Sequence, residues 1–129
     1  MFADESLTRL LREVAASASG LELLVLHGSR ARGDATASSD WDFGALGGFD
    51  PARLAARLGE AVGSDRVDVA DLARAGALLR YRAARDGVVI FELRAGAYDR
   101  FWKEAVGFYC DAKVPLSRAW EGVLEGLGR

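Results

Sequence analysis

The feature that most constrains the fold is an apolar run, Leu21 to Leu26, that leads directly into a Gly28-Ser29 turn. An apolar segment of this length, interrupted only by Glu22, predicts a buried β-strand. A glycine-serine pair at the end of a strand offers backbone N–H groups and a hydroxyl to an anion. Such a turn is weak evidence by itself, because many strands use glycine simply to turn the chain.

A pair of aspartates follows on the next expected strand, 40–46. Asp40 and Asp42 are separated by Trp41. Because successive side chains of a strand point to opposite faces, the two carboxylates share one face, with Cα atoms about 6–7 Å apart. Both can then reach one divalent cation. Aspartate is depleted in strands, and two neighbouring carboxylates repel without a cation or proton between them, so the pair predicts metal and nucleoside triphosphate chemistry.

A third acid lies further along the chain. Asp68 sits between two valines in a short expected strand, 66–69. If this strand neighbours that of Asp42, the spacing of about 4.8 Å between strands brings three carboxylates together. Asp71 is the competing choice, although its place before a helical pattern favours a capping role. The sequence favours Asp68 and leaves both open.

Other polar residues flank the turn. Arg30 and Arg32 are candidate phosphate ligands, since a guanidinium suits bidentate contact with phosphate, and the alternative is that both are solvated. Ser39 either hydrogen-bonds a phosphate or terminates the loop. His27 is expected to be packed or hydrogen-bonded rather than catalytic.

The pattern along the chain predicts a single α/β domain over residues 1–129, with helices packed on a small sheet and two helices at the C-terminal end. Asp4 or Ser6 caps the first helix, and Asp50 with Pro51 opens another. The expected helices lie after residue 4, at 30–32, from 51, after Asp71 with Leu79 buried, at 97–112 and from Pro115, and the expected strands at 21–26, 40–46, 66–69 and 88–93.

Composition narrows the partners and the compartment. The formal net charge of −2 argues against direct binding to nucleic acid or to an anionic membrane. Cys110 is the one cysteine, so no intrachain disulfide forms and a reducing compartment is expected. The N-terminal residues show no signal-peptide pattern, and no apolar run has the length of a membrane span. A cytoplasmic location is therefore expected.

The segments 28–33, 39–42 and 67–69 together resemble the nucleotidyltransferase superfamily that includes DNA polymerase β and the aminoglycoside nucleotidyltransferases. They are most similar to its minimal nucleotidyltransferases, the MNT proteins. The resemblance implies a small mixed sheet that binds Mg²⁺ and a nucleoside triphosphate, with ATP as the substrate. Carried onto this sequence, the resemblance makes Asp40, Asp42 and Asp68 catalytic and metal-binding and assigns the triphosphate to Gly28 and Ser29. Arg32 and Ser39 are added as candidate nucleotide ligands from their own chemistry, with the alternatives given above.

The same resemblance implies a partner. MNT proteins are paired with HEPN proteins in toxin–antitoxin modules, so the expected function is an antitoxin that transfers AMP to a tyrosine of a HEPN toxin. One alternative is a nucleotidyltransferase that modifies a small hydroxyl compound such as an aminoglycoside. Another is a non-catalytic antitoxin that acts by stoichiometric binding. The apolar faces of the C-terminal helices predict a homo- or hetero-oligomer surface.

Overall fold

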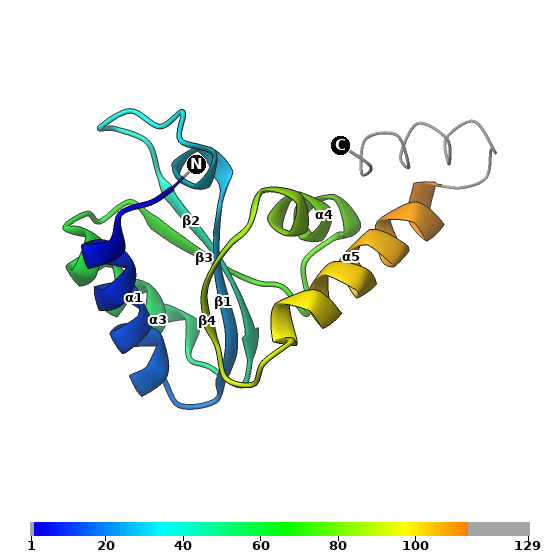
Figure 1. Ribbon diagram of the computed structural model, residues 1–129, viewed down its shortest axis with the longest axis horizontal. Coiled ribbons are helices and arrows are strands. Elements are labelled where there is room, and N and C mark those ends of the chain that lie inside the picture. Colours follow the sequence, from blue (N-terminus) through cyan, green and yellow to red (C-terminus); the bar gives the residue numbers. More distant parts are fainter. Residues whose placement is uncertain (1, 114–129) are drawn as a thin grey trace.

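The computed structural model describes residues 2–113, and a four-stranded sheet in the order β3-β2-β1-β4 lies at its centre (Figure 1). Strand β1 pairs antiparallel with β2 and with β4, whereas β2 and β3 run parallel. The sheet is therefore mixed, which confirms the fold expected from the sequence. The strands are β1 (Leu21–His27), β2 (Trp41–Gly47), β3 (Val67–Asp71) and β4 (Val88–Glu92).

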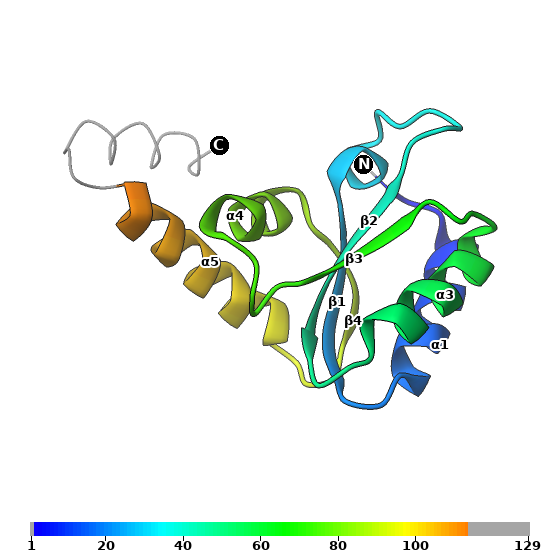
Figure 2. The ribbon, with the colours of Figure 1, turned by 180° about the vertical axis from the view of Figure 1, so that it is seen from behind.

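Helices cover both faces of this sheet. Two opposite views show α1 and α3 on one face, and α4 with α5 on the other (Figure 1 and Figure 2). The short α2 follows β1 at one end of the sheet. The helices are α1 (Glu5–Ser17), α2 (Gly28–Arg32), α3 (Pro51–Val62), α4 (Ala77–Asp86) and α5 (Ala97–Lys113).

Strand β1 belongs to both layers of the core, as its apolar run predicts. Every residue of β1 except Glu22 is buried. Leu24 and Leu26 pack with residues of α1 and α3, whereas Leu23 and Val25 pack with residues of α4 and α5. A strand that is buried on both faces needs apolar residues at successive positions, which is why this run does not alternate with polar residues.

The core also fixes the direction of the acids. Trp41 and Phe43 of β2 belong to the cluster packed against α1 and α3, and so do the two valines that flank Asp68. Because side chains alternate along a strand, Asp42 and Asp68 point to the opposite face, where α4 lies. The apolar–acid–apolar pattern thus orients both carboxylates toward the same side of the sheet.

Two helix starts agree with the sequence. The side chain of Asp4 accepts a hydrogen bond from the Leu7 backbone N at 3.0 Å, which makes Asp4 rather than Ser6 the N-cap of α1. Asp50 accepts from the Arg53 backbone N at 3.3 Å, one residue before the proline that opens α3. Each carboxylate satisfies a backbone donor that the first helical turn leaves free.

The helix predicted to follow Asp71 begins later than expected. The Asp71 side chain accepts from the Ala73 backbone N at 3.1 Å and closes a turn, and α4 starts at Ala77 with Gly76 as its N-cap. Such local side-chain bonds compete with helix formation. The prediction that Leu79 is buried is wrong, because this residue is 38% exposed.

The remaining boundaries differ from the predictions by one or two residues. Strand β2 begins at Trp41, so Asp40 precedes it, and α2 begins at Gly28 rather than at residue 30. The predicted helix from Pro115, and with it part of the predicted oligomer surface, lies outside the described residues. None of the helices within residues 2–113 has the length and apolar character needed to cross a membrane.

Candidate active site

Two aspartates from neighbouring strands lie side by side at one cavity. In the parallel pairing of β2 with β3, Asp42 is the register partner of Asp68. Both line a cavity of about 260 Å³ between the sheet, α2 and α4. Its lining consists of His27, Gly28, Arg32, Asp42, Asp68, Ala70, Leu79, Arg82 and Asp86.

The turn after β1 contacts the first of these acids. Gly28 has a φ of 73°, and a Cβ at this position would lie 2.5 Å from Asp42 Oδ2. Any other residue here would have to displace this carboxylate and would be strained at this φ. Gly28 opens α2, and the N-cap residue His27 makes no side-chain capping bond. Backbone N–H groups of the first turn, including that of Ser29, therefore remain available to an anion.

Negative charge accumulates around Asp42. Burial raises the pKa of Asp42 above its ordinary value of 3.8, and the carboxylates of Asp68 and Asp40 raise it further. His27 and Arg32 oppose this shift. A divalent cation would favour the ionised form and relieve the repulsion between these acids, so the residues fit a metal ion.

Asp40 lies apart from this pair. Its side chain is 65% exposed and stands 3.8 Å from Arg66 Nε, and it is not among the cavity-lining residues. Accordingly, within residues 2–113 no three His, Cys, Asp or Glu side chains are arranged as a group that could hold a metal ion. The structure brings Asp42 and Asp68 together, and the role of Asp40 as a metal ligand stays a prediction.

The structure separates the two candidates for the third acid. Asp68 is exposed in the cavity beside Asp42. Asp71 instead holds the turn before α4 through the Ala73 backbone, and its carboxylate lies 3.8 Å from Arg74 Nε. Asp68 thus has the position that the sequence favoured.

The two candidate phosphate ligands besides the turn differ in position. Arg32 lines the cavity, and its guanidinium forms ion pairs of 3.3 Å with both Asp34 and Asp86. Ser39 does not line the cavity, and its Oγ accepts from the Thr36 backbone N at 2.8 Å. These contacts match the alternative in which Ser39 terminates the loop.

Arg30, the other candidate phosphate ligand, contacts the loop that leads to β2. Its Nη2 donates to the Ser39 carbonyl at 2.9 Å, and its guanidinium lies 4.5 Å from the centre of the Trp41 ring. Cation–π contact and the hydrogen bond together hold the loop at 33–40 against the sheet. Arg30 therefore orders the segment that leads from the turn to the acid pair.

Asp86 is a cavity residue that sequence reasoning missed. Its side chain, 11% exposed, accepts from Arg85 Nε and Nη2 at 3.0 Å each and from Arg32 Nη1 at 3.3 Å. The bonds to Arg85 in particular lower the pKa of Asp86, so the carboxylate is firmly ionised. Asp86 links α4 to α2. Its only sequence signal, the step Asp86-Gly87 before a strand, indicates a turn and nothing about a contact across the cavity.

His27 is packed beneath the site, as expected. It is 7% exposed and is the register partner of Asp42 across β1 and β2. Burial lowers the pKa of its imidazole, and Asp42 opposes that shift. Nε2 has no hydrogen-bond partner among the described residues. The neutral ring thus forms the floor below the carboxylate.

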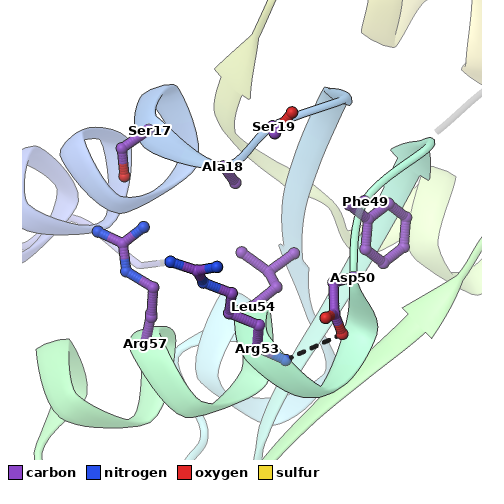
Figure 3. A pocket seen from close by; sticks show the side chains of 8 residues that line it. All are labelled: Ser17, Ala18, Ser19, Phe49, Asp50, Arg53, Leu54 and Arg57. Atoms are coloured by element: carbon purple, nitrogen blue, oxygen red, sulfur yellow. Dashed lines mark hydrogen bonds between the residues drawn. The ribbon is translucent and has the colours of Figure 1, made fainter.

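A second cavity, of about 210 Å³, lies between the end of α1 and the start of α3 (Figure 3). Arg53 and Arg57 point into it from α3, and Ser17 and Ser19 lie across from them. The carboxylate in its lining, Asp50, is engaged as the cap of α3. This cavity therefore offers no pair of acids to a metal ion, in contrast to the cavity of Asp42.

Comparisons with known proteins show the family of this chain. A family model described as polymerase beta, nucleotidyltransferase, matches residues 10–94, which contain the turn, Asp42 and Asp68. The chain belongs to this nucleotidyltransferase family.

A curated relative is the protein adenylyltransferase MntA of Aphanizomenon flos-aquae, 37% identical over 97 residues. That match covers 63% of this chain and 63% of the relative, so the chain spans somewhat less than two thirds of the relative's length.

Solved structures share the fold. A toxin–antitoxin structure with AMP-PNP aligns with a TM-score of 0.72 at 20% identity, over 95% of this chain and 98% of the other. The structure of a tri-AMPylated HEPN toxin of Shewanella oneidensis in complex with MNT antitoxin aligns with a TM-score of 0.61 at 21% identity. The alignment covers 96% of this chain and 94% of the other. At these identities the likeness shows a common fold.

Proposed function

We propose that this chain is a Mg²⁺-dependent adenylyltransferase that transfers AMP from ATP to a tyrosine hydroxyl of a HEPN toxin and thereby neutralises the toxin. The observation that carries the proposal is the pair Asp42 and Asp68 beside the Gly28 turn. The name of the MntA relative supports AMP transfer, and the descriptions of the aligned structures support ATP and a HEPN toxin as the reactants.

The acids are suited to hold Mg²⁺. Asp42 and Asp68 face one cavity, and burial first, then the neighbouring carboxylates of Asp68 and Asp40, raise the pKa of Asp42. Asp40 is exposed, and its one ion pair within residues 2–113 is a 3.8 Å contact with Arg66, so its side chain can turn toward the same ion. When bound, the metal neutralises the triphosphate and stabilises charge on the transferring phosphoryl group.

The residues of the chain orient the two reactants. The free N–H groups at Gly28 and Ser29 bind phosphate oxygens, and Arg32 flanks them. Asp68, which is exposed, accepts the proton of the tyrosine hydroxyl. The tyrosine oxygen then forms a bond to the α-phosphorus while the bond to pyrophosphate breaks. The products are the AMP ester of the tyrosine and pyrophosphate.

The test is an incubation of the full chain with a HEPN protein, ATP and Mg²⁺, followed by mass spectrometry of the HEPN protein. We expect a mass increase of one or more AMP groups, and we expect EDTA or the double variant Asp42→Asn with Asp68→Asn to abolish it. An unmodified HEPN protein in the presence of the folded wild-type chain would contradict the proposal.

Two other outcomes identify the alternatives. Nucleotide transfer to an aminoglycoside without any protein acceptor would indicate an enzyme that modifies small hydroxyl compounds. Neutralisation of the toxin by the variant Asp40→Asn with Asp42→Asn would indicate inhibition by stoichiometric binding.

A further inference from the structure

The cavity contains a cation whose partner is missing from the described part of the chain. Two arginines line it, Arg32 from α2 and Arg82 from α4. Arg32 is engaged by Asp34 and Asp86. Arg82 is exposed and forms no ion pair or hydrogen bond within residues 2–113. This guanidinium lines the cavity, is exposed to solvent and is therefore available to a ligand.

The geometry of α4 directs Arg82 toward this site. Leu79, Arg82 and Asp86 are spaced three and four residues apart, so they share one face of the helix. All three line the cavity. Asp86 fixes this face against α2 through its ion pair with Arg32. Figure 1 and Figure 2 show α4 on the side of the sheet opposite α1 and α3. The cavity is lined by Gly28 and Arg32 of α2 and by residues of α4.

The charges of the lining leave Arg82 available to an anion. Asp86 is already paired with Arg32 and Arg85. Asp42 and Asp68 have no ion pair with Arg82 within 4.0 Å, and under the proposed function both bind metal. Since no carboxylate within residues 2–113 pairs with this guanidinium, an anionic group of the substrate is a suitable partner for it.

We propose that Arg82 binds the β- and γ-phosphates of the nucleotide. This inference rests on the proposed function and names a residue outside the acid pair and the turn. The α-phosphate has to lie at the acids, where the acceptor attacks. The two terminal phosphates then extend into the space between α2 and α4, where a planar guanidinium can contact two oxygens at once. Arg82 also stabilises the charge on the departing pyrophosphate.

The test compares Arg82→Gln, Arg82→Lys and a surface control, Arg74→Gln. Arg74 has a side chain that is 89% exposed and does not line the cavity. Titration calorimetry measures the affinity of each variant for MgATP and for AMP. The comparison isolates the contribution of the β- and γ-phosphates, because AMP lacks these two groups. Thermal unfolding shows that each variant is folded.

We expect Arg82→Gln to weaken MgATP binding about tenfold or more and to leave AMP binding within about twofold of the wild type. Arg82→Lys retains part of the affinity, because it keeps the charge and loses the bidentate geometry. Arg74→Gln binds both nucleotides as the wild type does. AMP transfer to the acceptor slows in parallel with the loss of MgATP affinity.

Three results would overturn the inference while leaving the proposed function intact. They are unchanged MgATP affinity in Arg82→Gln, an equal loss of MgATP and AMP affinity, and a change confined to the KM of the protein acceptor. The last result would make Arg82 a contact for the partner. Absence of MgATP binding to the wild type would instead overturn the proposed function and the inference together.

Discussion

Gly28 and Asp42 approach each other so closely that a Cβ on the glycine would lie 2.5 Å from the aspartate Oδ2. The contact joins the turn after β1 to the acid on β2. It makes the position of the carboxylate dependent on the absence of a side chain at residue 28. The proposed metal ligand and the proposed anion site therefore share one local arrangement.

Substitution of Gly28 tests this relationship. We expect Gly28→Ala to destabilise the fold by about 1 kcal/mol, since alanine is strained at a φ of 73°. We expect it also to reduce AMP transfer about a hundredfold by displacing the carboxylate. The matched control is Gly48→Ala, because a Cβ at Gly48 meets nothing within 4 Å. Equal activity of the two variants would refute a positioning role for Gly28.

The crowding of acids predicts a specific response to magnesium. Asp68→Asn removes a charge that raises the pKa of Asp42, so we expect the metal-free variant to melt about 1–3 °C higher than the wild type. We expect Mg²⁺ to raise the melting temperature of the wild type and not of the variant. Asp65→Asn, an exposed substitution, is the control. The idea fails if Mg²⁺ stabilises Asp68→Asn as strongly as the wild type.

The pKa of Asp42 sets a pH dependence. Because its folded pKa is raised, the folded state binds more protons than the unfolded chain above pH 3.8. The stability that Asp42 contributes is thus full below 3.8 and is lost as the pH rises through its folded pKa. Melting curves of the wild type and of Asp42→Asn, recorded without metal at several pH values, measure this dependence. The difference by which the variant melts above the wild type should grow as the pH rises through that window. An advantage that is constant with pH would contradict the shift.

The pKa of Asp86 is shifted in the opposite direction from that of Asp42, so the stability that Asp86 contributes depends on pH with the opposite sign. Its lowered pKa means that its contribution to stability is present above pH 3.8 and is lost as the pH falls through the folded pKa. We expect Asp86→Asn to cost about 1–2 kcal/mol, since it leaves Arg32 and Arg85 without their carboxylate but half-exposed to water. Urea unfolding measures the loss of unfolding free energy. The control is Asp99→Asn, which removes an exposed i,i+4 ion pair with Lys103 and should cost less than half as much.

Local patterns in the sequence determined most of the sheet and the identity of the acids. The apolar run of β1 predicts a strand buried on both faces, and the apolar neighbours of Asp42 and Asp68 predict which way each carboxylate points. The capping residues Asp4 and Asp50 likewise signal the starts of two helices. These features depend on residues that are adjacent in the chain, which is why periodicity and capping rules detect them.

Tertiary structure alone decided which groups meet. The parallel register that sets Asp68, and not Asp71, beside Asp42 depends on the pairing of strands that are far apart in sequence. The ion pair of Arg32 with Asp86 spans 54 residues, and packing of Ala83 and Ala84 against the sheet places α4 with Arg82 at the cavity. Helix α4 starts only at Ala77, and Leu79 lies at the cavity wall instead of in the predicted core. Such contacts follow from the packing of whole elements, for which a single sequence carries no periodic signal.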